Sequence, residues 1–389
     1  MAGYEVIGIE EKKAVNDIFD LGGGVLFRHG FEAIRGQSYQ VRDFEKEFAS
    51  YMNVKNALAV SSGTAALRVA LASLNIGAGD EVLAPSFTFV ATIEAIIESG
   101  AKPICTEIDE TLNMDPEDLR KRITPRTKAV IVVHMLGTPA KMAEIVQICN
   151  EYKISLIEDT AWGCGGEFNG VKLGTIGDIG CFSFDFAKTI TTGEGGMVVF
   201  NSEENHQKAR AYHDHGHENN PSLPRWEDSR SSSGFNFRMS EVQGAIGRVQ
   251  LSKLNYIIKK QRDNENRIET VISKYPEFRM RVSPENSTGT ADAVVFHASP
   301  LLNVSEIRKS LLSVNISTKI LPEATSWHFA RHWTHLFDYD EITGMAIQES
   351  FNNSFKLLSS SISIPNGVYL RENFLIDLDT ALSMATKKI

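Results

Sequence analysis

One lysine is a candidate for covalent chemistry because of the segment that surrounds it. Lys188 follows the apolar stretch Phe182–Phe184 and precedes a glycine-rich turn, Gly193–Gly196, which leads into a second apolar run. A lysine at the end of a strand, partly removed from water, can lose its proton and form a Schiff base. A solvent-exposed loop lysine would fit this segment equally well, so the interpretation depends on other residues.

Three further segments could assist such a lysine. The apolar run from residue 154 ends in Glu158 and Asp159, and a carboxylate there could pair with a protonated pyridine nitrogen or cap a helix. Small residues around Gly63 form a strand-to-helix junction, where free backbone amides can bind phosphate. Phe89 follows another strand and could stack on a ring or belong to the core. Along the chain the four segments follow the order Gly63, Phe89, Asp159 and Lys188, each at the end of an expected strand. Together they indicate a fold-type I pyridoxal-phosphate enzyme.

The elements that must position these residues are short apolar runs alternating with amphipathic stretches between about residues 55 and 200. Unbroken apolar runs of this length favour a sheet buried on both faces, and the alternation predicts a mostly parallel, seven-stranded α/β sheet. The expected strands are Ala57–Val60, Glu81–Ala84, Lys102–Cys105, Ala129–Val133, Ile154–Ile157, Gly180–Phe184 and Gly196–Phe200. The expected helices are Thr64–Leu74, Thr88–Glu98 and Lys141–Tyr152.

The rest of the chain is predicted to form a smaller α+β domain. Residues 213–236 carry almost no periodic hydrophobicity and should be an irregular functional segment. A long helix from Ser240 to about Ser273 should connect the domains, which we place at residues 1–250, with the N-terminal segment, and 251–389. The second domain should contain strands at 293–298, 316–320 and 361–364, a helix at 304–313 and a final helix.

Composition excludes several classes of protein. The net charge of −9 over 389 residues argues against a nucleic-acid partner. No apolar run is long enough to span a bilayer, and Met1–Asp20 lacks the apolar core of a signal peptide, so we expect no membrane association and a cytoplasmic location. The four cysteines are widely spaced inside apolar runs and should be buried thiols.

These motifs closely resemble the DegT/StrS family of sugar aminotransferases over about residues 40–255. The order of the motifs is the family's own. The matching segments are Ser62–Leu67, Pro85–Thr92, His134 with Gly137, Glu158–Asp159, Gly177–Asp178, Phe182–Phe184, Lys188 with Thr192–Gly196, and Gly234–Glu241.

The resemblance implies pyridoxal 5'-phosphate as cofactor, no metal, and a homodimer with shared active sites. Lys188 would bond to the cofactor and act as general base, and Asp159 would pair with the pyridine nitrogen. Phe89 would stack on the ring. The phosphate would be held by Gly63, Thr64 and Ser183, joined by Asn236 of the second subunit. Glutamate would donate the amino group to a sugar acceptor.

One position departs from the family pattern. Many members read Asp-Ala-Ala-Gln where this chain has Asp159-Thr-Ala-Trp162. The usual glutamine faces the ring hydroxyl, whereas the indole N–H of Trp162 can donate a hydrogen bond but cannot accept one. We therefore expect Trp162 to contact the cofactor and to alter its electronics or the substrate pose.

Outside the cofactor motifs, the chain resembles the branch that aminates a free sugar acid. The matches are Phe27–Arg28, His213–His217, Lys188–Ile190 and Trp327–His328. That branch converts 8-oxo-3-deoxy-manno-octulosonate to 8-amino-3,8-dideoxy-manno-octulosonate, a sugar of lipopolysaccharide. Substrate contacts would fall on Arg28, which could anchor the carboxylate, and on His215, His217, His328 and Arg331.

Three alternatives stand beside this interpretation. The acceptor could be a nucleotide-linked 4-keto sugar, as in perosamine or bacillosamine synthesis. A non-catalytic regulatory member would have no need of Lys188. The alternating His213, His215 and His217 would share one face of an extended chain and could suggest zinc, but we expect substrate contact instead.

Overall fold

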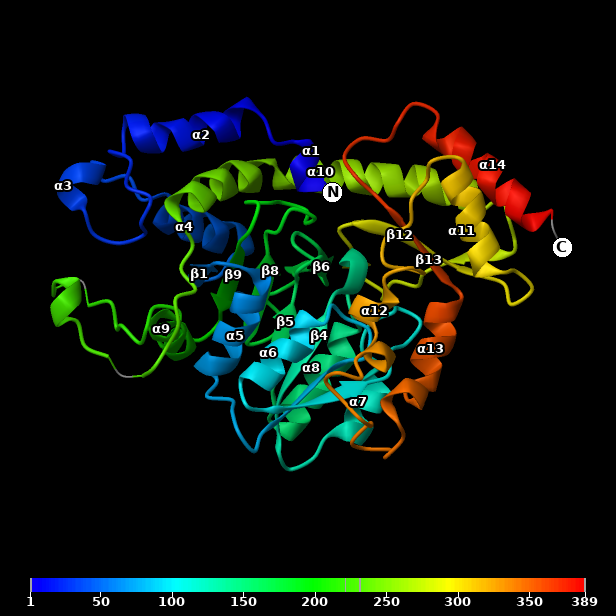
Figure 1. Cartoon of the computed structure of the whole chain (residues 1–389), viewed down its shortest axis with the longest axis horizontal. Helices are drawn as coiled ribbons and strands as arrows, with labels where there is room; N and C mark the ends of the chain where they lie inside the picture. The colour runs from blue at the N-terminus through cyan, green and yellow to red at the C-terminus, as the bar shows by residue number, and fades with distance from the viewer. Residues whose placement is uncertain (1, 221, 231, 388–389) are drawn as a thin grey trace.

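The computed structural model describes residues 2–220, 222–230 and 232–387 and has a seven-stranded sheet at its centre (Figure 1). The strand order is β1-β9-β8-β5-β4-β2-β3, and only β9 runs antiparallel to its neighbours. This confirms the predicted mostly parallel sheet. The strands are β1 (Asn56–Val60), β2 (Glu81–Pro85), β3 (Lys102–Thr106), β4 (Thr127–Val133), β5 (Ser155–Asp159), β8 (Ile179–Ser183) and β9 (Gly196–Phe200).

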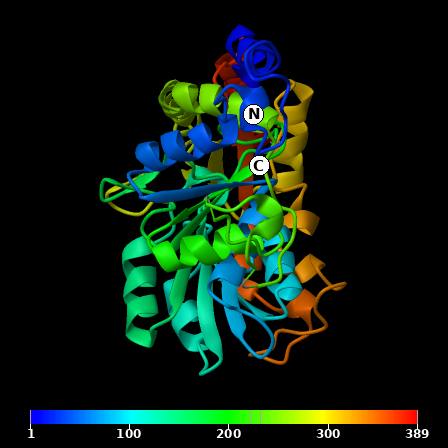
Figure 2. The same cartoon turned by 90° about the vertical axis from the view of Figure 1, so that its left-hand side faces the viewer.

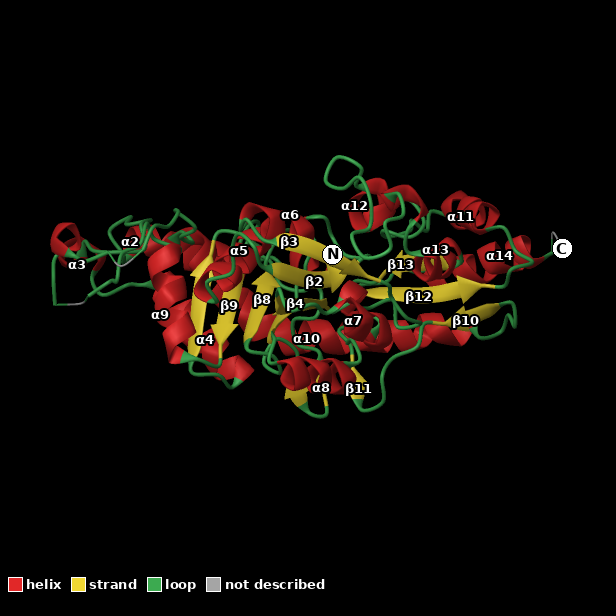
Figure 3. Cartoon of the chain, turned by 90° about the horizontal axis from the view of Figure 1, so that it is seen from below, coloured by secondary structure: helices red, strands yellow, loops and turns green. Residues whose placement is uncertain are grey.

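Helices cover both faces of this sheet, which explains why its strands are apolar without alternation. Figure 3 shows α5 and α6 on one side of the sheet and α8 and α10 on the other. The first face carries α5 (Gly63–Ser73), α6 (Ala91–Glu98) and α9 (Glu203–Tyr212). The second carries α4 (Gln40–Met52), α7 (Pro116–Arg122), α8 (Met142–Tyr152) and the first part of α10 (Glu241–Ile272).

The long helix α10 connects the large domain to the small one, as predicted. It begins in a capping box, in which Ser240 accepts from the Gln243 amide and the Gln243 side chain accepts from the Ser240 amide. Its first part packs on α4 and on α2 (Ile9–Asp20) (Figures 1 and 2), and later parts reach β12 and α14 (Figure 1). The domain boundary expected at residue 250 lies inside this helix.

The small domain has a three-stranded sheet covered by two helices. Its strands are β10 (Phe278–Met280), β12 (Ala293–Ala298) and β13 (Ser361–Pro365), and its helices α11 (Val304–Ser313) and α14 (Phe374–Thr386) enclose a separate core. The strand predicted at 316–320 was wrong. The backbone there turns, with a positive φ at Asn315 and Ile320, and only the Lys319 amide bonds to β13, at the Ser363 carbonyl.

The remaining elements are short. They are α1 (Ala2–Glu5), α3 (Glu32–Arg35), α12 (Thr325–His328), α13 (Asn352–Ser359), the turns η1 (Met135–Gly137), η2 (Arg225–Glu227), η3 (Ala330–His332) and η4 (Ile347–Glu349), and a sheet of β6 (Glu167–Phe168), β7 (Val171–Lys172) and β11 (Ser287–Thr288). The predicted irregular segment 213–236 contains only η2 and isolated bridges within its described part. All four cysteines are buried. No helix within the described ranges is long and apolar enough to cross a membrane.

Candidate active site

A cavity of about 220 Å³ lies where β5 and β8 end and α5 begins. We call it the Lys188 pocket. In open α/β sheets, ligands bind at the carboxyl ends of the strands. The pocket brings together seven predicted residues, namely Gly63, Thr64, Phe89, Asp159, Trp162, Ser183 and Lys188. It is also lined by Ser62, Thr92, Asp185 and Glu194, which the sequence analysis did not single out.

Lys188 is held in the pocket with little access to water. Only 8% of the residue is exposed, and burial lowers the pKa of its amine. Its Nζ lies 3.8 Å from the centre of the Trp162 ring and 4.0 Å from the Asp185 carboxylate. The Lys188 carbonyl accepts a hydrogen bond from the Gly3 amide, which ties the N-terminal helix to this segment. Burial thereby favours the neutral amine, which is the form that attacks an aldehyde to give a Schiff base.

Asp159 is the last residue of β5 and points into the same pocket. Its Oδ2 accepts a hydrogen bond from Thr92 Oγ1 at 3.0 Å, and its Oδ1 accepts one from the Ala161 amide at 3.2 Å. Thr92 is bonded in turn to Thr88 at 2.8 Å. Burial raises the pKa of the Asp159 carboxyl. A cationic ring nitrogen beside it would act in the opposite direction and favour the Asp159 carboxylate. The spacing of Thr88 and Thr92, four residues apart near the start of α6, is the sequence feature that could have predicted this chain of hydrogen bonds.

Glu158, the other acidic residue of the pair, has a structural role. It is fully buried and accepts hydrogen bonds from the amides of Gly174, Ile176 and Gly177 at 2.6–2.8 Å. His134 Nε2 lies 3.1 Å from the same carboxylate, and His134 Nδ1 accepts from the Ala140 amide. Glu158 therefore fixes the loop between β7 and β8 behind the pocket.

The start of α5 forms a cradle suited to phosphate. Ser62 is the N-cap, and its hydroxyl accepts from the Ala65 amide at 3.0 Å. The amides of Gly63 and Thr64 belong to the first turn and have no partner within the helix. A Cβ on Gly63 would lie 2.8 Å from the Ser183 Cβ, so only glycine leaves this approach open. Free amides, a helix N-terminus and a hydroxyl together fit the phosphate of pyridoxal phosphate.

Aromatic residues form one rim of the Lys188 pocket. The Phe89 and Trp327 rings stack with centroids 6.4 Å apart and planes 7° apart. His328 lies 5.4 Å from the Phe89 ring and 6.1 Å from the Trp162 ring. Burial lowers the pKa of His328 to about 4, so the ring is neutral, and its Nδ1 donates to the Ala324 carbonyl. The Trp327–His328 motif thus reaches this rim from the small domain.

Other predicted substrate residues lie outside the Lys188 pocket of the same chain. Arg331 binds the carbonyls of Ser350 and Glu349 and the Asn352 side chain. His215 is exposed in a turn with φ of 56°, whereas His217 is buried and its Nδ1 lies 3.1 Å from Asp228. Asn236 is exposed in the irregular segment.

The three alternating histidines do not share one extended face, because the chain turns at His215 and Gly216. Among the described residues, no group of three or more histidine, cysteine, aspartate or glutamate side chains is arranged to hold a metal ion.

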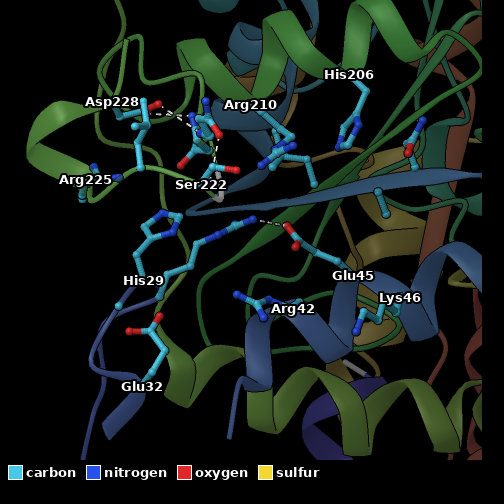
Figure 4. Close-up of a pocket in the computed structure, with 18 of the residues that line it drawn as sticks. His29, Glu32, Arg42, Glu45, Lys46, His206, Arg210, Ser222, Arg225 and Asp228 are labelled. Atoms are coloured by element: carbon cyan, nitrogen blue, oxygen red, sulfur yellow. Dashed lines mark hydrogen bonds and ion pairs between the residues drawn. The ribbon is translucent and has the colours of Figure 1, made fainter. Parts of the chain in front are cut away.

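Arg28 lies in a second, larger cavity of about 980 Å³, which we call the arginine-lined pocket (Figure 4). The pocket lies between residues 28–32 and α4 on one side and α9 with residues 219–220 and 222–228 on the other. Arg28 itself is engaged, with Nη2 2.6 Å from Glu45 and Nη1 bonded to the Ala59 carbonyl. The cations that make no ion pair with a described carboxylate are Arg42, Lys55 and Arg210.

Comparisons with known proteins show which family this chain belongs to. The profile of the DegT/DnrJ/EryC1/StrS aminotransferase family matches residues 32–376. GDP-perosamine synthase of Vibrio cholerae is 39% identical over 254 residues, 65% of this chain and 65% of that protein, so the match spans just under two thirds of its length. An uncharacterized protein of Methanocaldococcus jannaschii is 34% identical over 87% of this chain and 88% of its own.

A solved structure has the same fold over almost the whole chain. The aminotransferase from Psychrobacter cryohalolentis superimposes with a TM-score of 0.85 at 27% identity, covering 98% of both chains. With the pocket described above, these matches identify the protein's family. The chain belongs to the DegT/DnrJ/EryC1/StrS family of aminotransferases, whose cofactor is pyridoxal phosphate.

Proposed function

We propose that this protein transfers an amino group from glutamate to the carbonyl carbon of a sugar. The observation that carries the proposal is a buried lysine amine and a buried carboxylate, Lys188 and Asp159, in one pocket with a free helix N-terminus. These groups suit the aldehyde, ring nitrogen and phosphate of pyridoxal phosphate, respectively.

Each residue of the pocket has a defined task in this proposal. Bound pyridoxal phosphate supplies the electron-accepting ring that makes the α-proton of the donor removable. The first amides of α5 and the Ser183 hydroxyl bind the phosphate. Asp159, held by Thr92, keeps the ring nitrogen protonated. Lys188, as a neutral amine, would take the α-proton of the donor on Nζ and hold it there as an ammonium until the proton is passed on. The Phe89 and Trp162 rings keep water away from that amine.

We propose a homodimer with composite sites. The irregular segment 213–236 exposes Phe235 and Asn236 and, at its tip, Trp226, which is 84% exposed. Exposed aromatic side chains on such a segment suit an interface between subunits. In this arrangement Asn236 of each chain adds a phosphate contact to the Lys188 pocket of the other chain.

For the acceptor, we propose the eight-carbon sugar acid 8-oxo-3-deoxy-manno-octulosonate, aminated at its aldehyde. A free sugar acid needs a cationic anchor for its carboxylate. The arginine-lined pocket supports this, because Arg42, Lys55 and Arg210 line it and make no ion pair with a carboxylate among the residues described. Arg28, already bonded to Glu45, would supply only its remaining N–H groups. His328 would contact the acceptor from the aromatic rim.

A nucleotide-linked keto sugar is the second candidate. The similar proteins of known activity favour it, since they include a GDP-perosamine synthase and a dTDP-4-dehydro-2,3,6-trideoxy-D-glucose 4-aminotransferase from Saccharopolyspora spinosa. The same cations of the arginine-lined pocket would then meet a diphosphate.

An acceptor panel distinguishes the two candidates. Purified protein loaded with pyridoxamine phosphate is mixed with the eight-carbon aldehyde acid or with nucleotide-linked 4-keto sugars, and the return of the visible cofactor band is followed. Recovery with the aldehyde acid alone supports the first candidate, and the opposite pattern supports the second. No recovery with any sugar, in protein whose cofactor maps to Lys188 after borohydride reduction, would count against sugar amination.

A further inference from the structure

The Trp162 indole forms a wall against the reactive end of Lys188. The Lys188 Nζ lies 3.8 Å from the ring centre, well inside the range in which a cation is attracted to an aromatic face. Both residues are almost completely buried, with exposed fractions of 6% and 8%. Because little water competes at such a site, the attraction is larger than it would be on the surface.

Trp162 is fixed in place from both domains. Its backbone carbonyl accepts a hydrogen bond from Thr290 Oγ1 at 2.8 Å, and the Thr290 amide donates to the Gly137 carbonyl at 2.9 Å. The neighbouring His328 ring lies 6.1 Å from the indole. The backbone of Trp162 is therefore held by Thr290, and its indole lies near both the Lys188 amine and the His328 ring.

Two opposing influences act on the Lys188 amine. Burial disfavours its charged form and lowers its pKa. The Trp162 face and the Asp185 carboxylate, 4.0 Å away, favour the charged form. More distant charges come from Asp159 and from the Asp292–Lys319 ion pair of the small domain. Of the two close neighbours, the indole lies slightly nearer to Nζ and carries no charge of its own.

We propose that Trp162 is a positioning residue, whose indole face holds the Lys188 ammonium while Nζ is free of the cofactor and carries a proton. The inference deepens the proposed transamination, and it rests on Lys188 being the amine of that reaction. A proton removed from the donor resides on Nζ until it is passed on. The indole face lowers the free energy of that charged state and keeps Nζ inside the pocket.

The test measures the Lys188 amine directly in the full-length protein, in its pyridoxamine-phosphate form. Lysine carbons next to Nζ are labelled with ¹³C, and the signal is assigned with Lys188→Arg. Its titration gives the pKa of the amine. Biosynthetic fluorination of tryptophan weakens the negative face of the ring with little change in shape, so it isolates the cation–π attraction. We expect the pKa of Lys188 to fall stepwise with added fluorines, by about one unit at most.

The Trp162→Phe variant is the control that assigns the pKa change to Trp162. Fluorination also reaches Trp226, Trp327 and Trp333, so the series is repeated in Trp162→Phe protein, where it should change nothing further. An upfield shift of the Lys188 side-chain protons, caused by the indole ring current, should accompany the titration in wild-type protein and disappear in Trp162→Leu.

Two results would overturn the inference. If fluorination left the Lys188 pKa unchanged or raised it, there would be no attraction between the ammonium and the indole face. If the ring-current shift were absent, Nζ would not lie against the indole. Since neither readout depends on turnover, a protein that aminates no sugar yet gives the expected shifts would lose the proposed function and keep this inference. Failure of Trp162→Phe to fold would leave the wild-type fluorination series as the decisive measurement.

Discussion

The phosphate cradle gives the sharpest test of the site, through the substitution Gly63→Ala. The added Cβ would lie 2.8 Å from the Ser183 Cβ and 3.1 Å from its Oγ, so either Ser183 or the start of α5 must move. Ser183 ends a central strand and cannot withdraw easily, because β8 is paired on both sides. The change should therefore distort the cradle itself.

The expected magnitude follows from two opposing effects. Overpacking a tight site costs about 1–3 kcal/mol. Alanine is a better helix former than glycine by up to about 1 kcal/mol, but Gly63 is at the first position of α5, where this gain is small. The clash should dominate. If the cost falls on cofactor binding, the dissociation constant of pyridoxal phosphate should rise about five-fold to a hundred-fold.

A double-mutant cycle separates the clash from other effects. Ser183→Gly removes the colliding Cβ together with the hydroxyl, and Gly63→Ala/Ser183→Gly relieves the clash. Cofactor affinity is measured by absorbance titration of apoprotein and stability by thermal unfolding. The double variant should bind no worse than Ser183→Gly alone, which gives a coupling energy of about 1 kcal/mol or more.

Gly77→Ala is the matched control, because its Cβ would meet only the Ser99 carbonyl at an ordinary 3.5 Å. Wild-type cofactor affinity in Gly63→Ala, or strict additivity in the cycle, would refute the cradle as described.

Three further outcomes are expected. Asp159→Asn should keep the melting temperature and lose most turnover, because the lost charge lowers the pKa of the ring nitrogen; near-normal turnover would contradict its role. Mixing inactive Lys188→Ala and Asn236→Asp chains should restore some activity if sites are shared, and an inactive heterodimer, verified by tandem tags, would argue for separate sites. Glu158→Gln should lower the free energy of unfolding, measured in urea titrations, by about 3 kcal/mol or more. The reason is that an amide N–H would face the backbone donors that the carboxylate now accepts from. A loss under about 1 kcal/mol would show that the loop relaxes around the glutamine.

Much of the large domain could be predicted from local sequence. Each strand of the central sheet is an apolar run long enough to be recognised, since burial on both faces removes any polar alternation. Seven predicted residues meet in one pocket because strand ends in a parallel sheet converge on one edge. The predicted start of the long helix at Ser240 is also confirmed, and in the structure a capping box fixes it there. In contrast, 316–320 looked like a strand by composition, but the left-handed backbone at Ile320 prevents one.

Other features depended on contacts between residues that are distant in the chain. The residue pattern alone did not distinguish Glu158 from Asp159, and only the family resemblance pointed to Asp159. In the structure Glu158 faces a loop of backbone donors and Asp159 faces the pocket, because successive strand residues point to opposite sides. The stack of Phe89 on Trp327 joins the two domains. The sequence could not show that Arg28, the predicted carboxylate anchor, is already bonded to Glu45.

Local sequence indicated which residues could carry chemistry and at which strand ends they lie, because those signals depend only on neighbouring residues. Folding then set the partners of each polar or charged group, and thus the direction of its pKa shift. The Lys188 amine is the clearest example. Its desolvation and its contact with the Trp162 face come from side chains that only folding brings within 4 Å of each other.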